Sequence, residues 1–448
     1  MHRHLFVLFL LALTQITGWG MVSILPVIAT TVAKEFRTSL PMVFVGTSLM
    51  FVTMGLAAPW TGRAFRMFGA RSVMAVGAGL IGAGLSLLAL MPSLSLFWAA
   101  WVLIGMAGSM FLTPSAYAYI ADYAEDRARS LIGTLMLVTG LAGSVFWPVT
   151  AFLESGVGWR ATVLIYAGIM AFVVCPLVLI GLPATGTATV PATSARSARK
   201  GPVFALLVTA IALNSFVTFG IEAVGIQLLQ ATGMELARAV AVASLLGVFK
   251  VGGRVIDLLG GNRWDGLSTG IVSGAMIPIG LAVMWIGGQG ILSVAGFLVI
   301  YGVGSGAFAV ARATMPLVFF EKSDYAAAMA TIALPMNLIN ALAPPVLAAL
   351  MAGTGAHPVL AVLGALSTMA FLVLWQLNRK RSWSAIAGSL WPTHFCFNLH
   401  NAASGEVSIC NNRDCPDLDG VEKAASGQAI KRSKFFKFLL KPIISERF

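Results

Sequence analysis

Twelve apolar blocks follow one another along this chain, and each is close to the length that crosses a lipid bilayer as a helix. About 20 consecutive apolar residues span the hydrocarbon core of a bilayer. Only 10% of the 448 residues are charged and 58% are hydrophobic, whereas about a quarter of a soluble domain is charged. The blocks therefore meet lipid, and the sequence predicts an all-α membrane protein. The predicted spans are residues 4–33, 41–64, 72–92, 94–120, 131–153, 160–183, 202–230, 236–256, 267–287, 291–319, 326–353 and 357–378.

The N-terminal stretch MHRHLFVLFLLAL has the basic start and the apolar run of a secretory signal peptide. No small-residue cleavage site follows it, and the apolar residues continue to about Ala33. A run of this length is sufficient to cross the bilayer. We therefore expect the stretch to remain in place as the first transmembrane helix.

A polar stretch divides the predicted spans into two sets of six. Residues 184–201 are rich in small residues, Ser and Thr, and end in basic residues, which is typical of a flexible linker. The predicted organisation is a six-helix bundle at 1–183, this linker, a second six-helix bundle at 202–381 and a tail at 382–448. The His and Cys residues of the tail match no zinc spacing, and no metal site is expected. We expect this tail to be disordered and cytoplasmic, with a frameshifted or read-through end as the alternative to a functional segment.

The two halves repeat one another. The segment LIGMAGSMF around Gly105 matches VIYGVGSGAF around Gly302, and the two glycines are 197 residues apart. The glycine-rich gap between spans two and three has a second copy between spans eight and nine. A duplicated six-helix unit is typical of transporters that alternate access by moving one half against the other.

The basic residues report orientation rather than nucleic-acid binding. The net charge is +12, but the Lys and Arg residues lie in short gaps between spans, and no basic surface of the kind that binds nucleic acid is expected. Sixteen of them fall on one side of the predicted membrane and four on the other. Because short cytoplasmic loops are enriched in Lys and Arg, both termini are predicted to be cytoplasmic.

The hairpin APWTGRAFRMFGAR between spans two and three resembles the loop signature of the major facilitator superfamily, roughly Gly-x-x-x-Asp-Arg-x-Gly-x-Arg. Arg66 stands where that family usually has Asp, whereas the second copy, GRVIDLLGGNR, keeps its acid as Asp257. In the family this acid is thought to latch one conformation, so the resemblance implies a conformational gate at both loops. The residues concerned are Gly62, Arg66, Gly69 and Arg71 in the first copy and Gly253, Arg254, Asp257 and Gly260 in the second.

The resemblance covers about residues 5–380, and the segments GLAGSVFWPVTAF, GVGWRAT and YGVGSGAFAVARATMPLVFF are similar to a bacterial solute permease branch of the same superfamily. It implies the major facilitator fold, with twelve transmembrane helices in two pseudo-symmetric six-helix bundles. It also implies a monomer in the cell inner (plasma) membrane that moves a small solute, with H⁺ as the coupling ion and no cofactor.

Polar side chains inside the spans are the candidate solute and coupling sites, since spans one, four, seven and ten line the central path in that family. Arg312 stays charged within its span and needs a carboxylate or a bound anion, the alternative being a structural pair or a reach to the cytoplasmic interface. Glu222 is the candidate for the coupling proton, the alternative being an interfacial carboxylate at a helix end. The two differ in depth, so direct pairing is not expected. Further candidates, with interhelical hydrogen bonds as the alternative role, are Gln15, Trp19, Tyr117, Thr218 and Asn214.

Several function classes are excluded by missing motifs. No phosphate-binding Gly-x4-Gly-Lys-Ser/Thr loop occurs, so ATP does not drive transport from this chain, and no hydrolase motif suggests an enzyme. The leading prediction is a secondary active transporter that exports a small solute in exchange for protons. One alternative is an importer of a small organic anion of the monocarboxylate type. An alternative of another class is a non-transporting membrane receptor or scaffold that signals through the tail.

Overall fold

The computed structural model describes residues 2–124, 128–184, 201–260, 265–319 and 322–390, and every regular element in these ranges is a helix. Nearly all of the predicted linker and most of the predicted tail, residues 185–200 and 391–448, lie outside the described residues. Two compact units are defined by internal contacts, residues 1–378 and residues 379–448. The boundaries of the two six-helix bundles stay a prediction.

The helices of residues 2–184 follow the predicted spans one to six, with additional breaks inside spans one, four and five. They are α1 (His2–Val22), α2 (Leu25–Glu35), α3 (Leu40–Phe68), α4 (Ala70–Leu90), α5 (Leu94–Phe111), α6 (Thr113–Ala124), α7 (Ala128–Thr139), α8 (Ala142–Ile169), the π-helical turn η2 (Met170–Val174) and α9 (Cys175–Gly181).

The helices after the linker follow spans seven to twelve. They are α10 (Pro202–Ala231), α11 (Leu236–Gly260), α12 (Gly266–Gly287), α13 (Ile291–Thr314), α14 (Pro316–Phe319), α15 (Lys322–Thr354) and α16 (Ala356–Leu390). Residues 379–390 at the end of α16 belong to the second unit.

Eleven helical segments of the described chain are long and apolar enough to cross a membrane, and one of them is really two crossings. The segment Leu131–Gly181 has 51 residues, which as one helix would be about 77 Å long against a core of about 30 Å. Gly158 interrupts it with a φ of 81°. Thr150 Oγ1 lies 2.8 Å from the Tyr166 hydroxyl, although 16 residues of straight helix would separate them by about 24 Å. The chain therefore folds back at Gly158, and the twelve predicted crossings are present.

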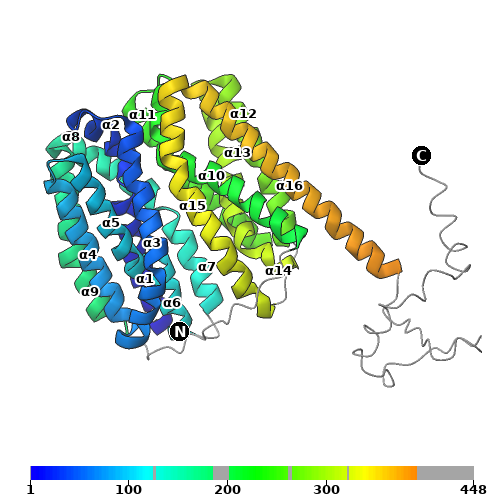
Figure 1. The fold of residues 1–448 in the computed structure, drawn as a ribbon, viewed down its shortest axis with the longest axis horizontal. Coiled ribbons are helices and arrows are strands. Elements are labelled where there is room, and N and C mark those ends of the chain that lie inside the picture. Colours follow the sequence, from blue (N-terminus) through cyan, green and yellow to red (C-terminus); the bar gives the residue numbers. More distant parts are fainter. Residues whose placement is uncertain (1, 125–127, 185–200, 261–264, 320–321, 391–448) are drawn as a thin grey trace, which may run out of the picture. The chain divides into compact units, whose positions relative to one another are not determined.

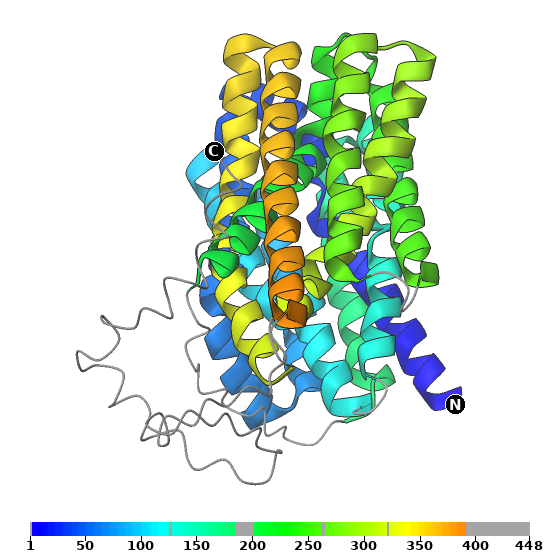
Figure 2. The ribbon, with the colours of Figure 1, turned by 90° about the vertical axis from the view of Figure 1, so that its right-hand side faces the viewer.

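Two seams join the helices before the linker to those after it. The helices α1–α9 gather on one side of Figure 1 and α10–α15 on the other, and they meet along α3 with α15 and along α8 with α11. Figure 2 shows that most of the long helices have roughly parallel axes, as membrane-crossing helices do. Phe219 of α10 also reaches the first half, and its phenyl ring meets that of Phe51 on α3 edge to face, with centroids 4.8 Å apart.

The repeated glycines perform the same packing task in each half. A Cβ on Gly105 would lie 1.9 Å from Thr53 Oγ1, so α5 touches α3 at this point. A Cβ on Gly302 would lie 2.6 Å from Phe249 Cβ, so α13 touches α11 in the same way. Small residues let membrane helices approach this closely. Span four packs on span two as span ten packs on span eight, in agreement with the predicted repeat.

Span one is interrupted between α1 and α2, and side chains from both halves bind the interruption. Trp147 Nε1 donates to the Ser23 carbonyl at 3.0 Å. Gln227 Nε2, from α10, donates to the Pro26 carbonyl at 2.7 Å. The helical ladder is broken here, because Pro26 lacks a backbone N–H and Val27 N bonds to the Ile24 carbonyl instead of that of Ser23. The Ser23 carbonyl is thereby left for Trp147.

Candidate functional site

Three basic side chains converge inside the bundle and form what we call the basic cluster: Lys250, Arg254 and Arg312. Lys250 and Arg254 lie one turn apart on α11 and so project from one face of it. Lys250 is 6% exposed, and Arg254 is half-buried. Arg312 lies in the last turn of α13, also half-buried. Because α11 packs along α13, Arg254 and Arg312 lie close enough to act on one another electrostatically.

Glu222 of α10 supplies the carboxylate of this region. Its Oε1 accepts a hydrogen bond from Lys250 Nζ and forms an ion pair with it. The Lys250 side chain is 8% exposed and that of Glu222 is 44% exposed, so the carboxylate is the accessible member of the pair. The sequence predicted no direct pair between Glu222 and Arg312, and none occurs among the described residues.

Arg312 has no partner of its own in the part of the chain that the structure describes. Neither an ion pair nor a hydrogen bond to its guanidinium occurs there, and the charged or polar groups that act on it are Arg254, Glu222 and Tyr117. A guanidinium in a transmembrane span is costly unless it is paired or faces a cavity. The predicted need of Arg312 for an anion is therefore unmet by these residues.

Two tyrosines border the basic cluster. Tyr117 of α6 is half-buried and interacts electrostatically with Arg254 and Arg312. Tyr301 of α13 is fully buried, and Glu222 acts on it. No hydrogen-bond partner for the Tyr301 hydroxyl lies among the described residues. Tyr117 belongs to the half before the linker, so groups from both halves border the cluster.

The charge balance of the basic cluster and Glu222 indicates which kind of solute this region can bind. Among the described carboxylates, only that of Glu222 acts on these cations, since Asp257, which lies three residues after Arg254, accepts from Thr269 and acts on neither arginine. Three cations against this one carboxylate leave an excess of two positive charges. Unbalanced charge is expensive in a low-dielectric interior, and a bound anion reduces that cost. Arg is well suited to this task because its planar guanidinium binds carboxylate or phosphate oxygens in pairs. The arrangement fits a small anionic solute.

Two predicted solute contacts, Gln15 and Trp19, bind the break in span four. Pro114 interrupts this span between α5 and α6, where backbone carbonyls lose helical partners. Gln15 Nε2 donates to the Phe111 carbonyl at 2.8 Å. Trp19 Nε1 donates to Thr113 Oγ1 at 2.5 Å. These hydrogen bonds fit the interhelical role given as the alternative, whereas Gln15 Oε1 is buried without a partner among the described residues, and a solute contact stays a prediction.

The remaining candidates on α10 differ in how they are satisfied. Thr218 Oγ1 donates to the carbonyl of Asn214 at 2.9 Å, a bond within its own helix. The Asn214 side chain is completely buried, and neither its Oδ1 nor its Nδ2 has a partner among the described residues. Asn214 lies two turns from Glu222 on the same face of α10, about 12 Å along the axis. It is a buried donor and acceptor that a solute or water can satisfy.

Most residues of the two predicted gate segments lie in helices, and their gating role stays a prediction. Gly62 and Arg66 lie inside α3, which continues to Phe68, and Arg66 is exposed. Gly69 alone makes the turn to α4, with a φ of 76° that glycine adopts without strain. Arg71 begins α4 and donates to the Leu182 carbonyl at 3.5 Å. The loop is shorter than predicted because one left-handed residue suffices for the turn.

The second copy is likewise helical rather than a loop, since α11 continues to Gly260. A Cβ on Gly253 would lie 2.1 Å from the Val303 carbonyl oxygen, so this glycine allows α13 to approach. Asp257 Oδ1 accepts a hydrogen bond from Thr269 Oγ1 of α12 at 2.7 Å. The acid thus joins two helices within the second half, and Arg254 belongs to the basic cluster.

Lys250 and Tyr301 were missed by the sequence analysis. Lys250 had been counted with the cytoplasmic loop charges, although it lies six residues inside the predicted span 236–256. An ionisable residue at that depth is itself a signal of a functional site. Tyr301 carried no such signal, because a tyrosine in an apolar span is usual.

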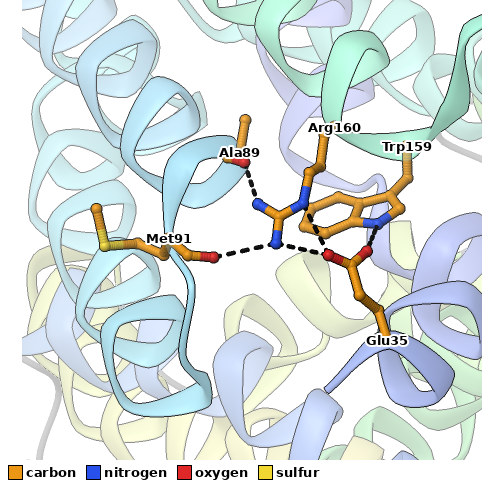
Figure 3. Close-up of polar contacts among 5 residues, drawn as sticks. All are labelled: Glu35, Ala89, Met91, Trp159 and Arg160. Carbon is orange, nitrogen blue, oxygen red and sulfur yellow. Dashed lines mark hydrogen bonds and ion pairs between the residues drawn. The ribbon is translucent and has the colours of Figure 1, made fainter. Parts of the chain in front are cut away.

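A second polar assembly lies away from the basic cluster and joins the ends of spans one, three and six (Figure 3). Arg160 Nε and Nη2 both donate to Glu35 Oε1, at 2.9 and 2.7 Å, and Trp159 Nε1 donates to Glu35 Oε2 at 2.5 Å. Arg160 also donates to the carbonyls of Ala89 and Met91. Because each of the three guanidinium nitrogens of Arg160 is engaged, we interpret this assembly as a structural contact between the spans.

Comparison with known families agrees with the membrane-protein fold described above. The family model of the Major Facilitator Superfamily matches residues 8–298. The chain belongs to the major facilitator superfamily. As a member of this superfamily it is a multi-pass membrane protein and a secondary transporter, and the predicted all-α, twelve-helix fold is confirmed.

Individual relatives of this major facilitator chain are distant. It is 25% identical over 151 residues to the uncharacterized MFS-type transporter YcxA of Bacillus subtilis (strain 168), a match that spans 34% of this chain and 37% of that protein. A bacterial homologue of the human lysosomal transporter Spinster, inward-facing and unoccupied, superimposes with a TM-score of 0.65 at 16% identity, covering 84% of this chain and 97% of that one. A nucleoside transporter, NupG, gives 0.70 at 13% identity, covering 84% and 99%. These structures share the fold.

Proposed function

We propose that this protein is a secondary active transporter of a small organic anion, which it moves by alternating access in exchange with or together with protons. The observation that carries the proposal is the basic cluster, in which Lys250, Arg254 and Arg312 face one carboxylate, that of Glu222. Arg312 without a partner is the proposed anchor for the solute carboxylate. Asn214 is the proposed neutral contact, because both ends of its amide are unpaired among the described residues.

Glu222 is the proposed proton carrier. Its carboxylate pairs with Lys250 and is the more exposed member of the pair, so water can reach it. Protonation removes its charge and releases Lys250 for the anion. One proton on Glu222 and one monoanion on the cluster together leave the charge of the loaded site unchanged, which favours a stoichiometry of one to one.

The proposal also includes the location of the protein and the direction in which the solute moves. The chain is proposed to act as a monomer in the cell inner membrane, with both termini in the cytoplasm, on the strength of the predicted distribution of Lys and Arg. Joint binding of the proton and the anion favours movement of both in the same direction, so import of a monocarboxylate down an inward proton gradient is the direction that this site supports. Export in exchange for protons, the leading prediction from the sequence, is the alternative, and it requires the proton and the anion to occupy the site in turn.

The test uses the purified full chain in proteoliposomes with an imposed pH gradient. Labelled acetate, lactate, pyruvate and benzoate form the panel, and glycerol is the neutral control. Uptake of at least one anion that depends on the gradient, with no uptake of glycerol, is expected. The direction of the gradient that drives accumulation distinguishes the exporter from the importer. Absence of uptake and of counterflow exchange for all four anions would contradict the proposal.

A further inference from the structure

Arg254 reaches across the seam between the two halves and binds the end of a helix in the other half. Its Nη1 donates to the carbonyl of Met136 at 2.5 Å. Met136 lies in the last turn of α7, which ends at Thr139, and span five resumes as α8 at Ala142. The Met136 carbonyl also accepts from Gly140 N and from Thr139 Oγ1, both at 3.3 Å. Carbonyls in the last turn of a helix carry partial negative charge, so a cation is stabilised there as well.

Gly140 makes room for this contact. A Cβ at Gly140 would lie 2.4 Å from Arg254 Nη1 and 3.1 Å from Arg254 Cζ. Gly140 does not have a positive φ, so no turn requires glycine at this position. The nearby approach of Gly247 to Ser144 brings α11 against α8 in the same seam. The absence of a side chain at Gly140 therefore creates the space that the guanidinium occupies.

The interaction of Arg254 with α7 leaves its charge incompletely satisfied. Its Nε is buried without a partner among the described residues. The groups that act on it electrostatically are Glu222 and Tyr117, and it in turn acts on Arg312. A carbonyl offers a partial charge, whereas an anion offers a full one and binds a guanidinium more strongly. An anion in the basic cluster therefore competes with α7 for Arg254.

We propose that Arg254 is a positioning residue that couples binding of the anion to movement of the two halves. In the empty carrier its guanidinium holds the end of α7, and a bound anion draws it away and releases the seam. A solute changes a conformational equilibrium only through different interactions in the two states, and this exchange of partners supplies such a difference. The inference rests on the proposed anion site, which it deepens.

The test variant is Gly140→Ala, which removes no charge and displaces the flexible end of Arg254 from α7. The control is Gly133→Ala on α7, where an added Cβ meets no atom within 4 Å. The probe is the panel anion that the wild-type protein transports fastest. We expect the KM of Gly140→Ala to fall about tenfold, because the anion no longer competes with a hydrogen bond of Arg254. The kcat is expected to fall by a similar factor, because binding no longer releases the seam. Gly133→Ala is expected to behave as the wild type.

Hydrogen exchange of residues 136–142 supplies a second measurement. It tests the role of Arg254 in the wild-type protein alone, without any variant. The anion is expected to raise exchange there, and in Gly140→Ala exchange is raised already and does not respond to the anion. Unchanged exchange in the wild type, or a Gly140→Ala variant with unchanged or higher KM, overturns the role of Arg254. Absence of uptake of every panel anion by the wild type instead overturns the proposed function, and this inference with it.

Discussion

The two halves of this transporter share a repeated plan but use their polar residues differently. Before the linker, the polar side chains in the spans bind backbone that proline has interrupted, as Gln15 and Trp147 do. After the linker, the spans carry ionisable groups, and three basic side chains share the one described carboxylate that acts on them, that of Glu222. The first half thus resembles a pre-organised scaffold, and the second half holds the charge that a solute can use.

The largest effect is expected when the unpaired charge of the second half is removed. Arg312→Ala should lower kcat/KM for anion uptake about 100-fold, because the solute loses a bidentate, charge-assisted contact. The apparent Tm should stay the same or rise, because the variant removes a charge that has no partner among the described residues. Labelled uptake and thermal unfolding in detergent measure the two quantities.

The matched control is Arg63→Ala, which removes an exposed arginine from α3 in the first half. It should leave uptake within about twofold of the wild type, since exposed charges are well solvated and contribute little. Equal losses in the two variants would mean that Arg312 acts only through net charge or folding, and the contrast between the halves would disappear.

Removing the charge of Glu222 should impair proton coupling without abolishing transport of the anion. Glu222→Gln retains the size and hydrogen-bonding capacity of the side chain but takes up no proton. Gradient-driven accumulation is expected to fall about tenfold, a typical coupling between two sites, whereas counterflow exchange at equal pH persists. Glu235→Gln, at an exposed site, is the control. If Glu222→Gln still accumulates the anion as the wild type does, the proton travels on another group.

A smaller effect distinguishes the two copies of the glycine-rich repeat. Gly253→Ala should destabilise the protein by about 1–3 kcal/mol, because its Cβ would overlap the Val303 carbonyl oxygen. Gly62→Ala should stabilise it by up to about 1 kcal/mol, because alanine favours the helix and an added Cβ there meets no atom within 4 Å. The apparent Tm is therefore expected to fall in Gly253→Ala and to rise in Gly62→Ala, relative to the wild type. A similar loss in both would show that the two glycines are equivalent.

The sequence predicted the fold well because its signal is repeated and local. Each span needs only about 20 apolar residues, and this requirement acts on every block independently. The predicted span 202–230 became α10, Pro202–Ala231, and 267–287 became α12, Gly266–Gly287. The predicted helix ends were wrong where a single residue turns the chain, as at Gly69. Apolar length predicts that a helix is present, but it does not give the residue at which the helix ends.

The candidate site was harder to predict, because it depends on which helices meet. Arg254 was assigned to a loop by its motif, and only the approach of α11 to α7 shows that it contacts Met136. Gln15 and Asn214 are similar amides in similar spans, and nothing local distinguishes them. One meets a free carbonyl from another helix, whereas the other meets no partner among the described residues.

These two amides give the finest comparison of the halves. Gln15→Leu should destabilise the protein by about 1–2 kcal/mol, because the buried Phe111 carbonyl loses its donor. Asn214→Leu should stabilise it by a similar amount, because it replaces two buried polar atoms that lack partners in the described structure with an apolar group of similar size. The KM for the anion should rise only in Asn214→Leu, if that amide contacts the solute. Thermal unfolding measures the stability of the two variants, and uptake kinetics measure the KM. If both variants shifted Tm in the same direction, Gln15 would not be the structural amide and Asn214 the unpaired one.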